Sequence, residues 1–313
     1  VGSGRIPFED TMINAAWQWT EDGDIIELGR PSSSARDASF DGQVIIGLSS
    51  TDNSSSFRWT AETGVEVLPG LGLPGTGITT SAKAVSGNGE VIVGKSAGMP
   101  FHWSENTGTV SLGDFNGEAN DVTPTGTIIV GMGSFNAANE PFLNQAFHWT
   151  KEEGAVPLGL ISGDSAFSMA SAISADGRII VGSSAQDLNN VKAFIWDAQN
   201  GMRDLKQVLE NEYNVDLSGW ALEKATSVSA NGNIIAGIGI SPSGYDQGWL
   251  VNLNQISASL EIALLSPTNS SAYFDNETVN FSAVATDVEE GDISSAITWS
   301  SNIDGLLGQG EQL

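Results

Sequence analysis

The sequence predicts an all-β protein: a β-propeller of six to seven four-stranded blades, followed by an incomplete β-sandwich. Three observations support this fold class. A strand-and-turn phrase recurs along the chain, an aromatic pair follows each copy, and the composition changes near residue 254. Repeats of about 40 to 50 residues with strand-type patterning are typical of propeller blades rather than of helical solenoids.

The recurring phrase combines a tight turn with an apolar strand. Its copies are FDGQVIIGLSS (40–50), GNGEVIVGKSA (87–97), PTGTIIVGMGS (124–134), SADGRIIVGSS (174–184) and ANGNIIAGIGI (230–240). Asn-Gly and Asp-Gly pairs favour a two-residue hairpin turn with φ > 0, a pattern that Thr125-Gly126 fits poorly. The apolar triplets do not alternate, so we expect neighbouring blades to cover both faces of this strand. The glycine after each triplet suits a bulge or the close approach of another backbone.

An aromatic pair around one variable position, here called the variable slot, follows each phrase. The pairs are Trp17-Gln18-Trp19, Phe57-Arg58-Trp59, Phe101-His102-Trp103, Phe147-His148-Trp149 and Phe194-Ile195-Trp196, with a degenerate Gly248-Trp249 at the end. Successive tryptophans are 40, 44, 46, 47 and 53 residues apart. Because side chains alternate across a strand, the aromatic residues face one side and the variable slot faces the other. We expect the aromatic side to fill the space between blades.

Each complete repeat is expected to supply four strands. In the repeat at 168–205 we expect them at 168–175, 178–184, 193–197 and 202–205. The first blade, at 1–30, lacks its first strand, and the propeller ends by residue 253. An open stack of sheets would expose two edges, so we expect the ring to close. A seventh blade, or the missing strand of the first blade, is expected upstream of Val1.

Residues 259–313 form a second predicted domain after a linker at 254–258. The segment contains no Lys or Arg and shows strand patterns in LEIALLSPT, ETVNFSAVATD and SAITWSSNIDG. It resembles the start of a bacterial immunoglobulin-like or cadherin-like module, in which Pro267 ends the first strand and Trp299 lies in the core. Such a sandwich needs about 100 residues. We therefore expect either a longer protein or a strand supplied by another molecule.

The charge balance excludes several classes of partner. The chain has 38 acidic and 12 basic residues and a formal net charge of -26. Such a surface repels phosphate backbones and anionic lipid, which argues against nucleic acid as a partner. No apolar run approaches the roughly 20 residues of a membrane-spanning helix, so we expect no membrane insertion. The absence of cysteine excludes disulfides and thiolate chemistry.

Few residues point to catalytic chemistry. His102 and His148, the only histidines, occupy the variable slot of consecutive pairs. Because the same slot elsewhere holds Gln18, Arg58 and Ile195, we interpret the histidines as structural. The sequence contains no serine-hydrolase elbow, zinc-protease helix or phosphate loop. Most acidic residues are expected in loops, which favours a solvated surface over a glycosidase pair.

The segment ATDVEEGDIS is the best metal candidate. Asp287, Glu289, Glu290 and Asp292 place several carboxylates on a short loop. Calcium takes roughly six to eight oxygen ligands, so these acids are interpreted as a calcium site. The resemblance to cadherin-like linkers supports this interpretation; the alternative is an acidic turn. Calcium is the one cofactor that the sequence indicates.

Residues 1–253 resemble the HAF repeat family of extracellular bacterial proteins. The matches are QAFHWTKEEGAVPLGL followed by SAISADGRIIVGSS, and SFRWTAETGVEVLPGL followed by AVSGNGEVIVGKS. The segment from Gly219 resembles the family's last repeat. The resemblance implies an exported protein of the bacterial surface or its surroundings. It implies no catalytic residues.

We therefore expect a secreted or cell-surface protein without enzymatic activity, with an adhesive or structural role. Propeller loops would form its contact surface, and its partners would be protein or glycan at the cell surface, or further copies of itself. Two alternatives stay open. One is a subunit of an extracellular filament assembled by strand addition, and the other is a polysaccharide-degrading propeller enzyme.

Overall fold

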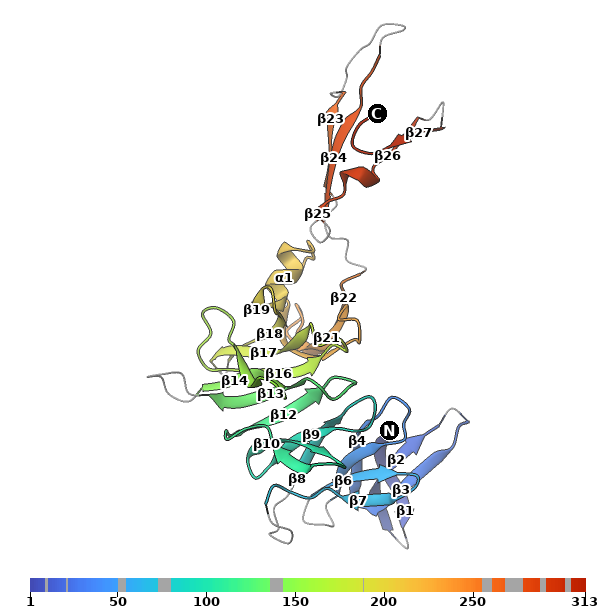
Figure 1. Ribbon diagram of the computed structural model, residues 1–313, viewed down its shortest axis with the longest axis vertical. Helices are drawn as coiled ribbons and strands as arrows, with labels where there is room; N and C mark the ends of the chain where they lie inside the picture. Colours follow the sequence, from blue (N-terminus) through green and yellow to red (C-terminus); the bar gives the residue numbers. More distant parts are fainter. Residues whose placement is uncertain are drawn as a thin grey trace. The chain divides into compact units, whose positions relative to one another are not determined.

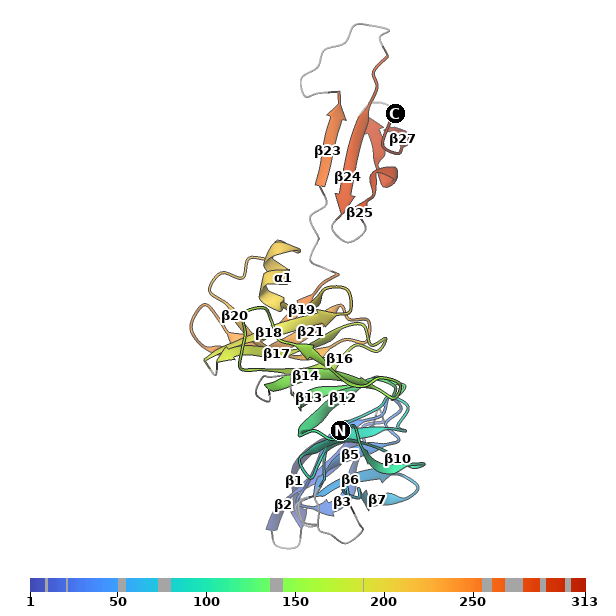
Figure 2. The ribbon, with the colours of Figure 1, turned by 60° about the vertical axis from the view of Figure 1, so that its left-hand side comes forward.

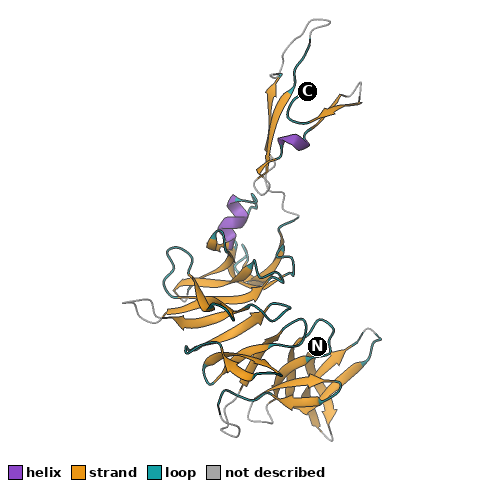
Figure 3. Ribbon diagram, viewed as in Figure 1, coloured by secondary structure: helices purple, strands orange, loops and turns teal. Residues whose placement is uncertain are grey.

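The computed structural model describes eleven stretches of the chain. They are residues 1–8, 11–20, 22–49, 55–72, 80–135, 143–187, 189–254, 261–267, 278–287, 291–301 and 305–313. The chain divides into two compact units, one comprising 1–206 and 219–251 and the other 207–218 and 252–313. In the described residues the first unit is built from antiparallel β-meanders that follow one another in chain order (Figures 1 and 3).

Six meanders, here called blades 1 to 6, are formed by the described residues of the first unit. Blade 1 contains β1 (Gly2–Phe8), β2 (Thr11–Trp19) and β3 (Ile25–Pro31), and blade 2 contains β4 (Ser33–Ala38), β5 (Ile45–Ser49), β6 (Ser55–Thr60) and β7 (Gly64–Val67). Blade 3 contains β8 (Thr80–Val85), β9 (Ile92–Ser96), β10 (Met99–Ser104) and β11 (Gly108–Ser111). Blade 4 contains β12 (Gly117–Val122), β13 (Ile129–Phe135), β14 (Leu143–Thr150) and β15 (Gly154–Gly159). Blade 5 contains β16 (Phe167–Ile173), β17 (Ile180–Asp187), β18 (Asn190–Asp197) and β19 (Gly201–Asp204), and blade 6 contains β20 (Ala221–Val228), β21 (Ile234–Ile240) and β22 (Asp246–Asn252).

Strand register confirms how the repeats map onto the blades. Gly47 on β5 lies opposite Phe57 on β6, and Gly2 on β1 lies opposite Trp17 on β2 in the same way. Blade 1 therefore begins with the second strand of the repeat, as predicted. Blades 2 to 5 have four strands each, and a parallel bridge between Asn144 and Phe167 joins blades 4 and 5 into one sheet.

The first strands of blades 2 to 6 converge on a cavity of about 210 Å³, here called the hub. It is lined by Asp37, Ala38, Phe40, Val85, Gly87, Asp121, Val122, Pro124, Ile173, Ala175, Val228 and Ala230. Backbone hydrogen bonds connect successive turns around it. They run from Phe40 N to Gly87 O (2.9 Å), Asn88 N to Pro124 O (3.0 Å) and Ala175 N to Ala230 O (3.0 Å). This convergence of equivalent strands makes the unit an all-β, propeller-like fold.

The apolar triplets are covered on both faces, as expected. Ile45, Ile46, Ile92 and Val93 are fully buried. The first residue of each triplet packs against the turn glycine of the next blade, where an added Cβ would collide with it. These pairs are Val44 with Gly89, Val91 with Gly126, Ile128 with Gly177 and Ile179 with Gly232. The turn glycines have φ between 68° and 78°, including Gly126 after the poorly fitting Thr125.

The glycine after each triplet faces a β-bulge in the first strand. In blade 4 the register shifts between Ala119 and Asp121, opposite Gly131. A Cβ on Gly131 would overlap the carbonyl oxygen of Glu118. Gly47, Gly94, Gly182 and Gly237 each meet a first-strand carbonyl in the same way. The predicted close approach of another backbone is therefore confirmed, and the bulge is its cause.

The described residues do not show closure of the ring, which stays a prediction. In two views blades 1 and 6 lie at opposite ends of the series (Figures 1 and 2). The slot residue Leu250 of blade 6 is 68% exposed, whereas the equivalent Ile195 of blade 5 is 4% exposed, and Trp19 of blade 1 is 57% exposed. At every described interface from blade 2 to blade 6, a first-strand turn of the later blade covers the earlier one.

One helix, α1 (Leu205–Asn211), was not predicted. It follows β19 and precedes β20, and it accounts for the longest spacing between aromatic pairs. Its buried residues Leu205, Val208 and Leu209 follow the helical i, i+3, i+4 pattern. Seven residues are too few for this period to stand out from the end of a strand.

The second unit contains two small sheets in its described residues. One consists of β23 (Glu261–Ser266), β24 (Ser282–Asp287) and β25 (Gly291–Asp292), and the other of β26 (Thr298–Ser301) and β27 (Gly305–Gln309), with η1 (Ser294–Ala296) between them. β23 ends directly before Pro267, as predicted. Half-buried Trp299 donates from Nε1 to Gly310 O at 2.8 Å and contacts Phe281. Most of the predicted linker at 254–258 lies outside the described residues.

Candidate functional site

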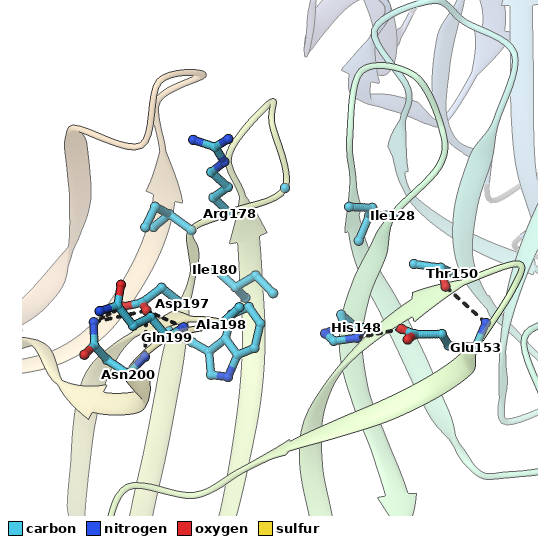
Figure 4. Close-up of a pocket in the computed structure, with 13 residues that line it drawn as sticks. Ile128, His148, Thr150, Glu153, Arg178, Ile180, Asp197, Ala198, Gln199 and Asn200 are labelled. Carbon is cyan, nitrogen blue, oxygen red and sulfur yellow. Dashed lines mark hydrogen bonds and ion pairs between the residues drawn. The ribbon is translucent and has the colours of Figure 1, made fainter.

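A pocket of about 630 Å³ opens between blades 4 and 5, and we call it the His148 groove. It is lined by Ile128, His148, Thr150, Glu153, Gly177, Arg178, Ile179, Ile180, Trp196, Asp197, Ala198, Gln199 and Asn200. Figure 4 shows the two walls: the side chains of His148, Thr150 and Glu153 come from blade 4, and those of Asp197 to Asn200 from blade 5. The groove thus lies along the seam between consecutive blades.

His148 forms the blade 4 side of the groove. It occupies the variable slot on β14, and its ring meets Trp196 of the next blade edge-on, with 5.7 Å between ring centroids. Its Nε2 lies 3.8 Å from Glu153 Oε2. The turn that carries Glu153 is held by a hydrogen bond from Glu153 N to Thr150 Oγ1 (3.2 Å). The histidine therefore connects the aromatic floor of the groove to an acidic rim.

Asp197 shapes the opposite wall. Its carboxylate accepts hydrogen bonds from Gln199 N (2.9 Å), Asn200 N (2.8 Å) and Arg203 Nη2 (2.9 Å). Burial alone would raise the pKa of Asp197, but these hydrogen bonds, a further one from the Asn200 side chain and the positive charge of Arg203 outweigh burial and lower it. Asp197 is thus an anion that holds the β18–β19 turn in place.

The same seam is filled differently between blades 2 and 3, at a pocket of about 450 Å³ that we call the Arg58 groove. The guanidinium carbon of Arg58 lies 5.5 Å from the centroid of the Trp103 ring. Arg58 also forms ion pairs with Glu66 (3.4 Å) and with Glu105 of the next blade (3.5 Å). Here the slot residue itself lies over the tryptophan and is held by two carboxylates.

A third seam, between blades 3 and 4, repeats the contact with the other histidine. The His102 ring lies 5.4 Å from the Trp149 ring. Burial lowers the pKa of His102, and the nearby charge of Lys151 adds to this effect. Both histidines therefore contact the tryptophan of the following blade.

The hub contains two carboxylates that the sequence interpretation missed. Asp37 accepts hydrogen bonds from Ala38 N (2.9 Å) and, across the seam, from Val85 N (2.8 Å). Asp121 repeats the arrangement two blades later with Val122 N (2.8 Å) and Ile173 N (2.9 Å). The signal was present in the sequence, because these acids replace the Ala or Ser found at the same position in the other repeats.

Burial dominates the electrostatics of the hub. It raises the pKa of Asp121 to about 6 against the lowering effect of its backbone donors, and the charge of Asp37 raises it further. The pKa of Asp37 is raised for the same main reason. Both oxygens of each carboxylate accept backbone hydrogen bonds that join one blade to itself and to the next. Their visible role is to hold bulged strands together.

The predicted calcium site lies only partly within the described residues. Glu289 and Glu290 are outside them, and Asp287 is described as the last residue of β24. Asp292 accepts a hydrogen bond from Ser294 N (2.9 Å) and another from the Ser294 hydroxyl, which lower its pKa. In the part of the chain that the structure describes, no three side chains of the metal-binding types gather around a common point. The calcium site stays a prediction.

No membrane-spanning helix is found among the described residues, where none is both long and apolar enough. No known family model matches the chain, and no curated protein matches it. Similar solved structures include TolB from Acinetobacter baumannii (17% identity, TM-score 0.49, covering 76% of this chain and 60% of that one). This chain thus spans about three fifths of that TolB structure.

Two further structures show a similar degree of likeness. The β-propeller domain of the Trilobed protease from Pyrococcus furiosus has 12% identity and a TM-score of 0.49, with 90% of each chain covered. Oligogalacturonate lyase from Vibrio parahaemolyticus has 10% identity and a TM-score of 0.45, with 97% of this chain and 88% of that one covered. At such identities the likeness concerns the fold and not the activity, and the propeller assignment above stands on the strand register and the hub.

Proposed function

We propose that this chain is a non-enzymatic binding protein whose propeller unit presents the His148 groove to a partner. The support is the nature of the groove. Its floor is apolar and half-buried, formed by Ile128, Ile179 and Trp196. The side chains of Thr150, Asp197 and Asn200 beside it hold turns through hydrogen bonds. Exposed apolar surface with a polar rim is typical of binding sites.

The Arg58 and His148 grooves differ in the residues that surround the variable slot, and this difference supports the proposal. The two carboxylates that hold Arg58 in its groove correspond by strand register to Val156 and Ala198 in the His148 groove. There the shorter His148 occupies the slot, and the pocket is larger, at about 630 Å³ against about 450 Å³. The blade 4–5 seam is therefore the more open of the two.

We propose that this binding protein works outside the bacterial cell or on its surface. The HAF-like repeats and the acidic composition favour secretion or display on a bacterial surface, with protein or glycan as partner. The second unit would serve as a spacer or anchor, as the partial immunoglobulin-like module that its sequence resembles. Calcium at residues 287–292 would stiffen that module, in keeping with the predicted carboxylate loop.

Blocking the groove tests the proposal. Ala198 is an exposed residue of the β18–β19 turn that lines the groove, so Ala198→Trp should fill it without disturbing the core. Ala61 occupies the same position in the β6–β7 turn and is also exposed, so Ala61→Trp is a matched control. The wild type and both variants would be screened on glycan and peptide arrays, with sedimentation to detect self-association.

We expect at least a tenfold loss of array binding for Ala198→Trp and an unchanged signal for Ala61→Trp. Equal binding by all three proteins would refute the groove as the contact site. A wild-type protein that binds no glycan, no peptide and no copy of itself would refute the binding function.

Hub geometry favours one enzymatic alternative, a polysaccharide-degrading propeller. Asp37 and Asp121 place two carboxylates on one cavity, and a carboxyl with a pKa near 6 suits general acid catalysis. An assay of reducing ends on plant and marine polysaccharides would detect this activity. Turnover that disappears in Asp121→Asn would favour the enzyme over the binding protein.

The second unit favours another alternative, a filament subunit. β23 is an edge strand in its sheet, and Ile262, Leu264 and Leu265 on it are more than half exposed. Such an edge is open to strand addition by another molecule. Electron microscopy of native material would decide, because regular fibres would establish the filament.

A further inference from the structure

We infer that the His148 groove receives an arginine side chain from a partner protein. The inference rests on the proposed function and names the chemistry of the partner. It starts from the chain itself, which places its own arginine over the equivalent tryptophan. The guanidinium of Arg58 lies over the Trp103 ring, 5.5 Å from its centroid, and pairs with Glu66 and Glu105.

The space for an added side chain comes from the slot residue. His148 contacts Trp196 edge-on, at an interplanar angle of 63°, and is shorter than an arginine. Trp196 is partly buried and lines the groove together with Ile128 and Ile180. A planar guanidinium with an apolar stem matches such a surface, because it stacks on aromatic faces and is weakly hydrated.

Glu153 is the rim carboxylate that would pair with a bound cation, because Val156 and Ala198 stand where Glu66 and Glu105 hold Arg58. Glu153 extends from the rim with 65% of its side chain exposed, and its neighbour His148 lies at 3.8 Å. Arg178 is the one cation of the rim among the described lining residues, and it is directed to solvent, 85% exposed and paired with Asp176 (3.6 Å). The net charge of -26 adds a long-range attraction for a basic partner.

The test uses a minimal probe, the capped tripeptide acetyl-Gly-Arg-Gly-amide, with its citrulline analogue as an uncharged isostere. Binding would be followed by NMR titration of the tryptophan indole N–H signals, with Trp196→Phe to assign the Trp196 signal. We expect the arginine peptide to shift the Trp196 signal with saturation. We expect at least a fivefold weaker effect from the citrulline peptide. Equal shifts from both peptides would overturn the role of the charge.

Two groove variants sharpen the test. His148→Arg should fill the groove from within, as Arg58 does, and reduce peptide affinity at least tenfold while the melting temperature is maintained. Glu153→Gln removes the rim carboxylate and should weaken binding about threefold to fivefold. If His148→Arg fails to fold, Ala198→Trp replaces it, because that position lies on an exposed turn. Unchanged affinity in both the filled variant and Glu153→Gln would overturn the site.

The reverse change offers an independent check. Arg58→His should open the Arg58 groove, where Glu66 and Glu105 are left to receive a guanidinium. We expect the arginine peptide then to shift the Trp103 signal as well, which it does not shift in the wild type. If array binding proves to be to glycans, and no arginine peptide shifts Trp196, the arginine inference fails while the binding function stands. If nothing binds, both fail.

Discussion

The Arg58 and His148 grooves lie at equivalent seams between consecutive blades, but different residues occupy the variable slot in each. In both, the slot residue of one blade meets the tryptophan of the next, and a triplet residue packs against a turn glycine. In the first groove a long cation bridges two carboxylates and occupies part of the seam, leaving a pocket of about 450 Å³. In the second a shorter imidazole leaves it open. The residue in this slot thus sets how much of the seam is occupied.

Both grooves are built on bulged first strands, and the glycines that face these bulges are the positions least tolerant of a side chain. Gly131→Val would force side-chain atoms into the carbonyl oxygen of Glu118 on the neighbouring first strand of blade 4. We expect a loss of more than about 3 kcal/mol in the free energy of unfolding. Gly248→Ala is the control, because a Cβ there has no neighbour closer than 3.8 Å. Urea denaturation would measure the stability of both variants. Similar midpoints would show that the bulge position tolerates a side chain.

The hub links blades 2 to 6, so protonation of its carboxyl groups should change the stability of the blades at both grooves alike. The pKa of Asp121 is raised from 3.8 to about 6, so the folded state binds the proton more tightly than the unfolded state. Its contribution to stability is complete below about pH 4 and is lost as the pH rises through 6. The loss amounts to at most about 3 kcal/mol.

Asp121→Asn should remove this part of the pH dependence. Stability curves of the wild type and the variant from pH 4 to 7 would be subtracted, so that the contributions of other carboxyls cancel. A difference that does not change with pH would contradict the raised pKa. Asp37→Asn should show the same sign, because burial also raises the pKa of Asp37.

Removing the slot residues tests the contrast directly. Arg58 is 12% exposed, lies over the Trp103 ring and pairs with two glutamates, so Arg58→Ala should cost about 1 to 2 kcal/mol. His148→Ala removes a looser contact and should cost less than about 1 kcal/mol. Thermal unfolding of the two variants would compare the grooves. Equal costs would show that the His148 seam is as tightly filled as its counterpart.

A turn hydroxyl gives a small expected effect that should be the same at both grooves. Ser174 accepts from Ile179 N (3.0 Å) and donates to Asp176 (2.7 Å), at the turn that carries Gly177 into the His148 groove. Ser174→Ala should cost about 1 kcal/mol. Ser86→Ala removes the equivalent contacts beside the Arg58 groove and should cost the same. Denaturation midpoints that differ strongly would show that the two turns are not equivalent.

Much of the fold could be predicted because the repeats reinforce one another. Five copies of one phrase located the second strands, the turn glycines and the buried triplets. The helix α1 was missed because it occurs once and is seven residues long. Ring closure was expected from a general rule about sheet edges, and it stays a prediction.

The candidate site was less predictable for a physical reason. His148 and Trp196 are 48 positions apart, and neither gives a sign in the sequence that the two meet. The sequence shows Asp37 and Asp121 as acids at a position that is otherwise small. Their hydrogen-bond partners Val85 and Ile173 come from the following blade, so the sequence did not indicate these contacts.

The sequence by itself determined what each blade contains, because strand alternation and turn chemistry act over a few residues. It determined the acidic surface and the absence of cysteine in the same direct way. Only the tertiary structure decided how open each seam is. The opening depends on whether the slot residue of one blade reaches the tryptophan of the next blade and the carboxylates beside it, and local sequence patterns do not encode that distance.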